Sequence, residues 1–315
     1  MRSSFRCRPL RRIGRALKRG SSSDASWSSV GTTAVAKIAV MGISGVFGLV
    51  NTSLIIRYFG ADAFAQYGLL ATFPTLMPFT DLGIGAVILN TVASSTDPAH
   101  DSTVRRTITT AVRVLLGSAL VISTVGVVIL LLGAWPGLLG GKLMEGGGLT
   151  ATVCLIIYAA ALPLSVGQRV IIGLGRSTTQ VISQGVVSPA MSCFLLLAIV
   201  TGLGRGNAVS IYSYIANALV SVICIVVAWR ATRPLFKGAL RDVPRLRSVR
   251  GVRIVNTAGP QLLQSLAIPI AFQTDRLLLS HLGQSQALAE YNLANNLFNM
   301  LTQTVMAAGV AMWPM

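Results

Sequence analysis

Five amide side chains recur on one helical face near the end of the chain. Asn292, Asn295, Asn296, Asn299 and Gln303 stand at i, i+3, i+4, i+7 and i+11 in an otherwise apolar stretch. Residues with this spacing share one side of an α-helix. Neutral amides suit sugar hydroxyls, so the pattern favours contact with a carbohydrate in a polar cavity. Hydrogen bonds to neighbouring helices would explain the same stripe without any ligand.

A second polar face is expected at the start of the apolar part of the chain. Lys37, Ser44 and Asn51 recur every seven residues, which keeps them within about 40° of one another on a helix. One interpretation is a polar stripe along a cavity, whose lysine meets an anionic group. The other is a lysine that snorkels to the membrane interface, beside two polar residues that pack between helices.

Asp81 lies where the sequence predicts an interrupted helix. It follows Pro74 and Pro78 within an apolar stretch, and prolines remove a backbone donor and break or kink helices. A carboxylate at such a break could gate a transport path. It could also cap the backbone groups that the break exposes.

Four more polar residues lie in the apolar stretch 254–280. Gln261 and Asp275 are fourteen residues apart and share a face if the helix is straight, and Gln264 lies about 60° away. Asp275 and its neighbour Arg276 could form a self-contained ion pair near the outer end of the helix. The alternative places these residues in a substrate path, and for Asp275 only the family resemblance given below favours it.

The residue types that catalyse reactions or bind metals are not clustered in this sequence. The four cysteines form no C-x-x-C pair, and the two histidines are isolated from each other. The nine acidic residues are scattered, with no pair spaced for general acid–base catalysis. The glycine-rich stretches lack the pattern of a phosphate-binding loop. We therefore expect no enzymatic activity, no metal site and no cofactor.

The elements that position these side chains are predicted to be membrane-spanning helices. Mean hydropathy is +0.69, and only 11% of the residues are charged, too few to cover a soluble protein of this size. A helix needs about 20 mostly apolar residues to cross a bilayer. Eight such spans are predicted, roughly at 32–56, 67–93, 108–133, 149–168, 181–203, 210–229, 254–280 and 288–312. The weakest is 67–93, because prolines interrupt it.

The basic residues orient these spans. With the N-terminus in the cytoplasm, only Arg57, Lys142, Arg205 and Arg276 fall at outer ends or in outer loops. This asymmetry is typical of a multi-pass protein of the cytoplasmic membrane, with the segment 230–253 also cytoplasmic. The net charge of +17 is thus explained by topology and by contact with anionic membrane lipid, not by nucleic acid.

The chain also repeats a short pattern. Residues 57–69 and 280–293 each combine an apolar residue, glycine, a polar turn, alanine and Tyr-x-Leu. Six predicted spans separate the copies, which indicates a parallel repeat of the kind found in secondary transporters. The prediction is an all-α polytopic membrane helix bundle with an incomplete second half. Its parts are a basic disordered tail (1–30), a six-helix half (31–229), a linker (230–253) and two further helices (254–315).

Two stretches resemble a known family. The segments L-I-I-R-Y-F-G (54–60) and T-D-L-G-I-G (80–85) resemble the start of the polysaccharide-export flippases, which belong to the multidrug/oligosaccharidyl-lipid/polysaccharide exporter superfamily. The segment F-Q-T-D-R-L-L-L (272–279), followed by A-E-Y-N-L-A (289–294), resembles the opening of that family's second half. The resemblance implies a longer protein, with about four further spans, so we expect this sequence to be truncated.

The resemblance further implies a transport function. Such a protein would move a polyprenyl-pyrophosphate-linked oligosaccharide between leaflets for surface polysaccharide synthesis, beside a polysaccharide assembly machinery. Two alternatives stay open: a cation-coupled drug exporter of the same superfamily, and an inactive truncated membrane protein. Asp81 is the only deep acid in the first six spans, which argues against a carboxylate-centred drug site.

Overall fold

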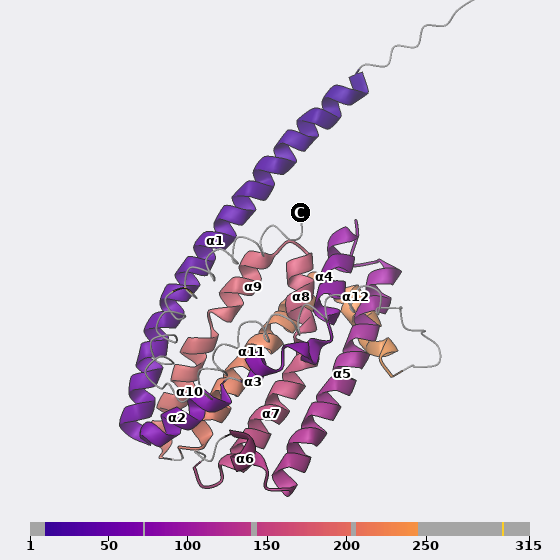
Figure 1. Cartoon of the computed structure of the whole chain (residues 1–315). Helices are drawn as coiled ribbons and strands as arrows, with labels where there is room; N and C mark the ends of the chain where they lie inside the picture. The colour runs from indigo at the N-terminus through magenta and orange to yellow at the C-terminus, as the bar shows by residue number, and fades with distance from the viewer. Residues whose placement is uncertain (1–9, 72, 140–143, 203–205, 245–297, 299–315) are drawn as a thin grey trace, which may run out of the picture.

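In the computed structural model, residues 10–71, 73–139, 144–202, 206–244 and 298 are described (Figure 1). Within these ranges the chain folds into helices and contains no strand. An all-α architecture is therefore confirmed. The predicted spans 254–280 and 288–312 lie outside the described residues, apart from residue 298.

The described part of the chain contains five helical segments that are long and apolar enough to cross a membrane. They confirm five of the predicted spans. The segments are the apolar part of α1 (Leu10–Phe59), α5 (Ser102–Leu131), α7 (Gly147–Leu164) with α8 (Val166–Gly173), α9 (Ser177–Gln184) with α10 (Val187–Thr201), and α11 (Ala208–Ala231).

Two regions differ from the predicted boundaries. The helix α1 begins at Leu10, so residues 10–30 are helical in the structure, where the composition predicts a disordered tail. No proline follows Pro9 until Pro74, so nothing in the backbone chemistry stops the helix in between. The predicted linker 230–253 begins with the last two residues of α11 and then contains a short helix, α12 (Arg233–Asp242).

The predicted span 67–93 is interrupted, as its prolines indicate. The segment divides into α2 (Ala61–Leu70), α3 (Phe73–Leu76), the 3₁₀ turn η1 (Pro78–Asp81) and α4 (Ile84–Ser94). Proline at 74 and 78 prevents a regular ladder of backbone hydrogen bonds. In Figure 1 the four pieces together run from one end of the bundle to the other.

Side chains of neighbouring helices replace the lost backbone hydrogen bonds. Tyr214 of α11 donates its hydroxyl to the Leu70 carbonyl at 2.7 Å, and Ser118 of α5 donates to the Thr80 carbonyl at 3.0 Å. Thr80 itself donates to the Met77 carbonyl at 2.9 Å. Because lipid offers no water for unpaired carbonyls, a broken helix at membrane depth needs such partners.

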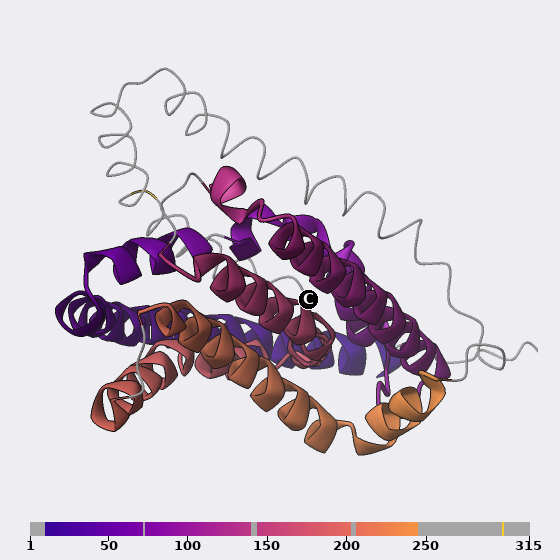
Figure 2. The ribbon, with the colours of Figure 1, turned by 90° about the horizontal axis from the view of Figure 1, so that it is seen from below.

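The helices alternate in direction, which gathers the connections at two ends (Figures 1 and 2). The start of α5, the α8–α9 turn and α12 lie at one end, whereas α2 and α6 (Trp135–Leu139) lie at the other. Outward side chains are apolar, such as Leu120, Leu131 and Val200, which are 70%, 80% and 83% exposed. A surface of this kind suits lipid, so the molecule is a multi-pass membrane helix bundle.

Glycine permits the tightest helix contact near the cavity described below. A Cβ atom at Gly167 of α8 would lie 2.5 Å from the Ile225 Cα of α11. Only a residue without a side chain allows these two backbones to approach so closely, a common device between membrane helices. This contact sets the spacing of α8 and α11.

Candidate functional site

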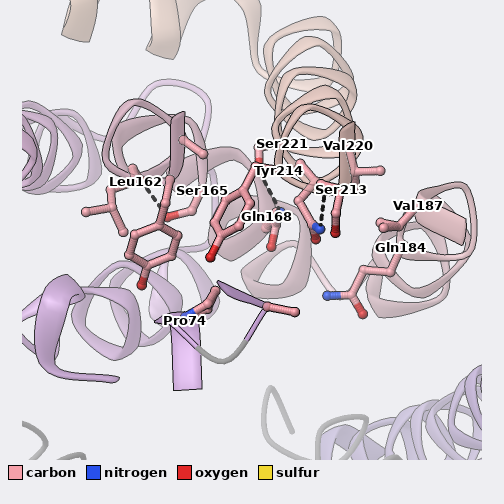
Figure 3. A pocket seen from close by; sticks show the side chains of 14 residues that line it. Pro74, Leu162, Ser165, Gln168, Gln184, Val187, Ser213, Tyr214, Val220 and Ser221 are labelled. Carbon is pink, nitrogen blue, oxygen red and sulfur yellow. Dashed lines mark hydrogen bonds between the residues drawn. The ribbon is translucent and has the colours of Figure 1, made fainter. Parts of the chain in front are cut away.

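A cavity of about 440 Å³, lined by both polar and apolar side chains, lies among α3, α7, α8, α9, α10 and α11 (Figure 3). All of the described residues that line it are uncharged. Figure 3 shows Leu162 and Ser165 on one side of the cavity and Gln184 and Val187 on the other. The lining consists of Ala71, Pro74, Tyr158, Ala161, Leu162, Ser165, Gln168, Gln184, Val187, Ser213, Tyr214, Asn217, Val220 and Ser221.

The helix α11 contributes a hydrogen-bonding stripe to this cavity. Ser213, Asn217 and Ser221 are spaced four residues apart, so they lie on one helical face. The Asn217 amide donates to the Ser213 carbonyl at 3.0 Å, and the Ser221 hydroxyl donates to the Asn217 carbonyl at 3.2 Å. These local bonds use one amide hydrogen of Asn217 and the hydroxyl hydrogen of Ser221, while the Asn217 side-chain oxygen accepts none within the described part of the chain.

Two glutamines complete the polar lining from other helices. Gln168 of α8 donates from Nε2 to the Ser221 hydroxyl at 3.2 Å, which holds its side chain in place. Gln184 of α9 is exposed, and its amide has no hydrogen-bond partner within the described residues. Together they present amide donors and acceptors from two different helices. Such groups can exchange hydrogen bonds with a ligand that carries hydroxyls.

Two tyrosines form the wall next to the broken segment. The Tyr158 hydroxyl lies 2.8 Å from Thr80 Oγ1, and the Tyr214 hydroxyl is bonded to the Leu70 carbonyl. Their polar ends are therefore engaged in holding α2 and η1, and their rings face the cavity. These two hydrogen bonds therefore link the cavity wall to the broken segment.

Asn51 takes part in a helix contact away from this cavity. Its side chain is 5% exposed, donates to the Ser188 carbonyl at 3.2 Å and accepts from the Ser192 hydroxyl at 2.6 Å. The packing alternative therefore accounts for Asn51. Lys37 and Ser44 of the same helix are half-buried and do not contribute to the lining either.

Asp81 caps the end of the break. Its Oδ1 accepts a hydrogen bond from the Gly83 amide at 3.0 Å, and Oδ2 lies 3.6 Å from a guanidinium nitrogen of Arg169. Leu82 has a φ of 50° and Gly83 one of 70°, a left-handed turn that glycine favours and leucine rarely adopts. A Cβ at Gly85 would lie 2.7 Å from Arg169 Nε, so this glycine leaves room for the arginine. The capping alternative accounts for this geometry.

The remaining predicted site residues lie outside the described part of the chain. They are Gln261, Gln264, Asp275, Arg276, Asn292, Asn295, Asn296, Asn299 and Gln303. No cluster of three histidine, cysteine or acidic side chains that could hold a metal ion occurs among the residues described.

The cavity residues were missed by sequence reasoning, although one signal was available. Ser213, Asn217 and Ser221 repeat every four residues within an apolar span, the same type of pattern as the amides at 292–303. Gln168 carries a weaker signal, as a lone amide five residues after Pro163. A search of all spans for polar stripes would have found α11, but not the helices that face it.

Comparison with known families identifies the group to which this fold belongs. The model of the polysaccharide biosynthesis protein family matches residues 29–315. The chain belongs to this family. No curated protein sequence matches the chain.

Solved structures show the same fold. An outward-facing multidrug resistance MATE family transporter of the MOP superfamily is 18% identical, with a TM-score of 0.55. A MOP superfamily transporter from Pyrococcus furiosus, described as having a binding pocket of reverse polarity, gives the same values. A MATE protein in complex with MaD3S is 16% identical, with a TM-score of 0.52. Each match covers 90% of this chain but only 62% or 63% of the solved structure. The family member described here therefore has the fold of the MOP superfamily transporters.

Proposed function

We propose that this family member moves a lipid-linked oligosaccharide, a polyprenyl pyrophosphate sugar, across the cytoplasmic membrane for surface polysaccharide synthesis. The observation that carries the proposal is the uncharged cavity lined by Gln168, Gln184, Ser213, Asn217 and Ser221. Its volume of about 440 Å³ falls in the range of about 300–1,000 Å³ typical of ligand sites. Sugar hydroxyls both donate and accept hydrogen bonds, and these side chains offer both.

Several features support transport without chemistry. Flipping a lipid-linked sugar breaks no covalent bond; it requires shelter for the polar head while the lipid tail stays in the bilayer. A polar cavity inside an apolar bundle provides such shelter, and the connection between its tyrosine wall and the broken segment offers a route for conformational change. We further propose that the end carrying α12 is cytoplasmic, because exposed basic residues gather there.

The second half of the proposed path would come from residues beyond the described part. We propose that residues 31–229 form the first half of a two-half transporter and that residues 254–315 begin the second. In this proposal the amides at 292, 295, 296, 299 and 303 face the same path, with Gln261, Gln264, Asp275 and Arg276 nearby. The polysaccharide assembly machinery would receive the translocated product.

A cation-coupled drug exporter is the competing function. Such a transporter would need a carboxylate whose protonation or cation binding changes with transport. The described lining contains none, and Asp81 is held by the Gly83 amide and faces Arg169. The cavity chemistry therefore favours the sugar substrate.

The proposal is tested in proteoliposomes that contain a fluorescent polyprenyl-pyrophosphate oligosaccharide built from neutral sugars. An impermeant quencher reports how much of the lipid reaches the outer leaflet. Replacing Gln168 and Asn217 together by leucine should reduce the translocation rate by about tenfold or more, because each lost hydrogen bond is worth about 0.5–1.5 kcal/mol. The matched control is Asn90→Leu, which removes an exposed amide from α4 outside the lining. Wild-type translocation in the double variant would refute the cavity as the sugar path.

A parallel test concerns the amides of the eighth predicted span. Replacing Asn295 and Asn299 by leucine should also stop translocation without preventing membrane insertion, if they line the same path. Unchanged translocation would remove these residues from the proposal and leave the described cavity as the only contact with the sugar.

A further inference from the structure

The short helix α12 has two faces of different chemistry. Leu235, Phe236 and Ala239 are at most 2% exposed and pack into the bundle. The exposed face carries Arg233, Lys237 and Arg241 at i, i+4 and i+8, the spacing of a single stripe along a helix.

Contacts with α5 fix α12 in place, and the only acidic residue of α12 forms an ion pair in these contacts. Asp242 is 7% exposed and lies 2.6 Å from an Arg105 guanidinium nitrogen. Arg113 donates to the carbonyls of Asp242 and Val243 at 2.6 and 3.0 Å. The helix is thus held by its apolar face and its C-terminal end. No exposed acid from residues 229–244 offsets the three basic side chains.

The residues before α12 suit the edge of a membrane. Trp229, two residues before the end of α11 at Ala231, is 51% exposed, and Arg230 beside it is exposed as well. Tryptophan is enriched at the depth of the lipid headgroups. In Figure 1, α12 lies at the end of the bundle where α11 ends and α5 begins.

We propose that the exposed face of α12, formed by Arg233, Lys237 and Arg241, docks on the anionic headgroups of the membrane surface. Charge complementarity selects this partner, because the three exposed cations lie on the helix that follows Trp229, at the boundary of the apolar bundle. Anionic lipid attracts basic residues close to a membrane, by roughly fivefold in affinity for each residue. The docked helix would hold the beginning of the segment 230–253 on the bilayer. This proposal does not depend on the substrate of the transporter.

The test uses the whole chain in bilayers that contain a photoactivatable phosphatidylglycerol or a phosphatidylcholine with identical acyl chains. Mass spectrometry measures the crosslink yield of each lipid on residues 229–244, relative to the yield on α10. We expect phosphatidylglycerol to label this segment about fivefold more than phosphatidylcholine. In the variant R233Q/K237Q/R241Q the ratio should fall close to one.

The matched control is R57Q/R106Q/R176Q, which removes three exposed arginines elsewhere and leaves the contacts of Asp242 intact. Its ratio on 229–244 should equal the wild-type value. Three results would overturn the proposal: equal labelling by both lipids in the wild type, an equal fall in both variants, or no labelling of 229–244 by either lipid. The last result would mean that water or an acidic protein covers this face.

Discussion

The contact between α1 and α10 and the cavity beside α11 use the same kinds of side chain in opposite ways. In the first, Asn51 and Ser192 bond to each other and to the Ser188 carbonyl, and both side chains are buried. In the second, Asn217 and Gln184 are exposed in a cavity of about 440 Å³. An asparagine inside a membrane helix can therefore close a contact or line a space.

The difference between the two regions depends on the facing helix. Opposite Asn51, α10 supplies the Ser192 hydroxyl and the Ser188 carbonyl at bonding distance, and both bond to the asparagine amide. Asn217 instead borders the cavity, and no neighbouring helix among the described residues supplies a partner for its side-chain oxygen. Irregular backbone at membrane depth is found where it lines a cavity or is covered by protein.

The largest expected effect comes from a side chain that prevents the close contact between α8 and α11. In the variant Gly167→Ala the new Cβ would lie 2.5 Å from the Ile225 Cα, and a backbone cannot move aside as a side chain can. We expect a loss of about 3 kcal/mol in the free energy of unfolding, measured by thermal unfolding in detergent. Gly117→Ala is the control, since nothing lies within 4 Å of a Cβ there. Equal stability of both variants would contradict the described helix spacing.

A pair of substitutions separates packing from binding directly. Asn51→Leu should lower the free energy of unfolding by about 2 kcal/mol, because it removes two buried hydrogen bonds between α1 and α10. Asn217→Leu should change stability by less than about 0.5 kcal/mol, because an exposed amide is removed, but should slow translocation severalfold. Stability is measured by denaturant unfolding and translocation in proteoliposomes. The reverse pattern would exchange the roles assigned to the two asparagines.

Substitutions of Asp81 test whether its role is capping or transport. Asn can still accept the hydrogen bond of the Gly83 amide, so Asp81→Asn should lose only the half-exposed ion pair with Arg169, at a cost below about 1 kcal/mol. Translocation should be retained. Asp81→Leu loses the cap as well and should be less stable than Asp81→Asn. If Asp81→Asn abolished transport at normal stability, a carboxylate-dependent exporter would gain support.

The smallest expected effect concerns Asp101, outside the membrane-spanning segments. The Thr103 amide at 2.7 Å and the Ser95 hydroxyl at 2.8 Å both donate to this carboxylate, and they lower its pKa below the ordinary value of 3.8. Its stabilisation of the first turn of α5 is therefore complete above pH 3.8 and is lost as the pH falls through the lowered value.

Hydrogen exchange measures this effect at the first amides of α5. Asp101→Ala should increase the exchange of these amides relative to the wild type at pH 5. The difference should vanish in strong acid, where the wild-type carboxyl is protonated. A difference that stayed constant with pH would show that the charge of Asp101 is not involved.

The sequence by itself determined the class of the protein and much of its plan. Long apolar runs predict the five membrane helices that the structure confirms. A bilayer demands a minimum helix length and a backbone whose hydrogen bonds lie within the helix. Prolines at 74 and 78 predict an interruption of the span 67–93, and the structure contains one, which divides the segment into short helices and a 3₁₀ turn. The family resemblance, carried by short motifs such as T-D-L-G-I-G, is confirmed by the match to residues 29–315.

Only the tertiary structure decided which polar face meets which neighbour. Helical periodicity places Lys37, Ser44 and Asn51 on one side of α1, but it does not indicate that α10 carries Ser188 and Ser192 opposite Asn51. It likewise does not indicate that Gln168 and Asn217, 49 positions apart in the chain, line the same cavity. The physical reason is that the spacing along one helix is local, whereas a cavity exists only where several helices fail to fill the space between them.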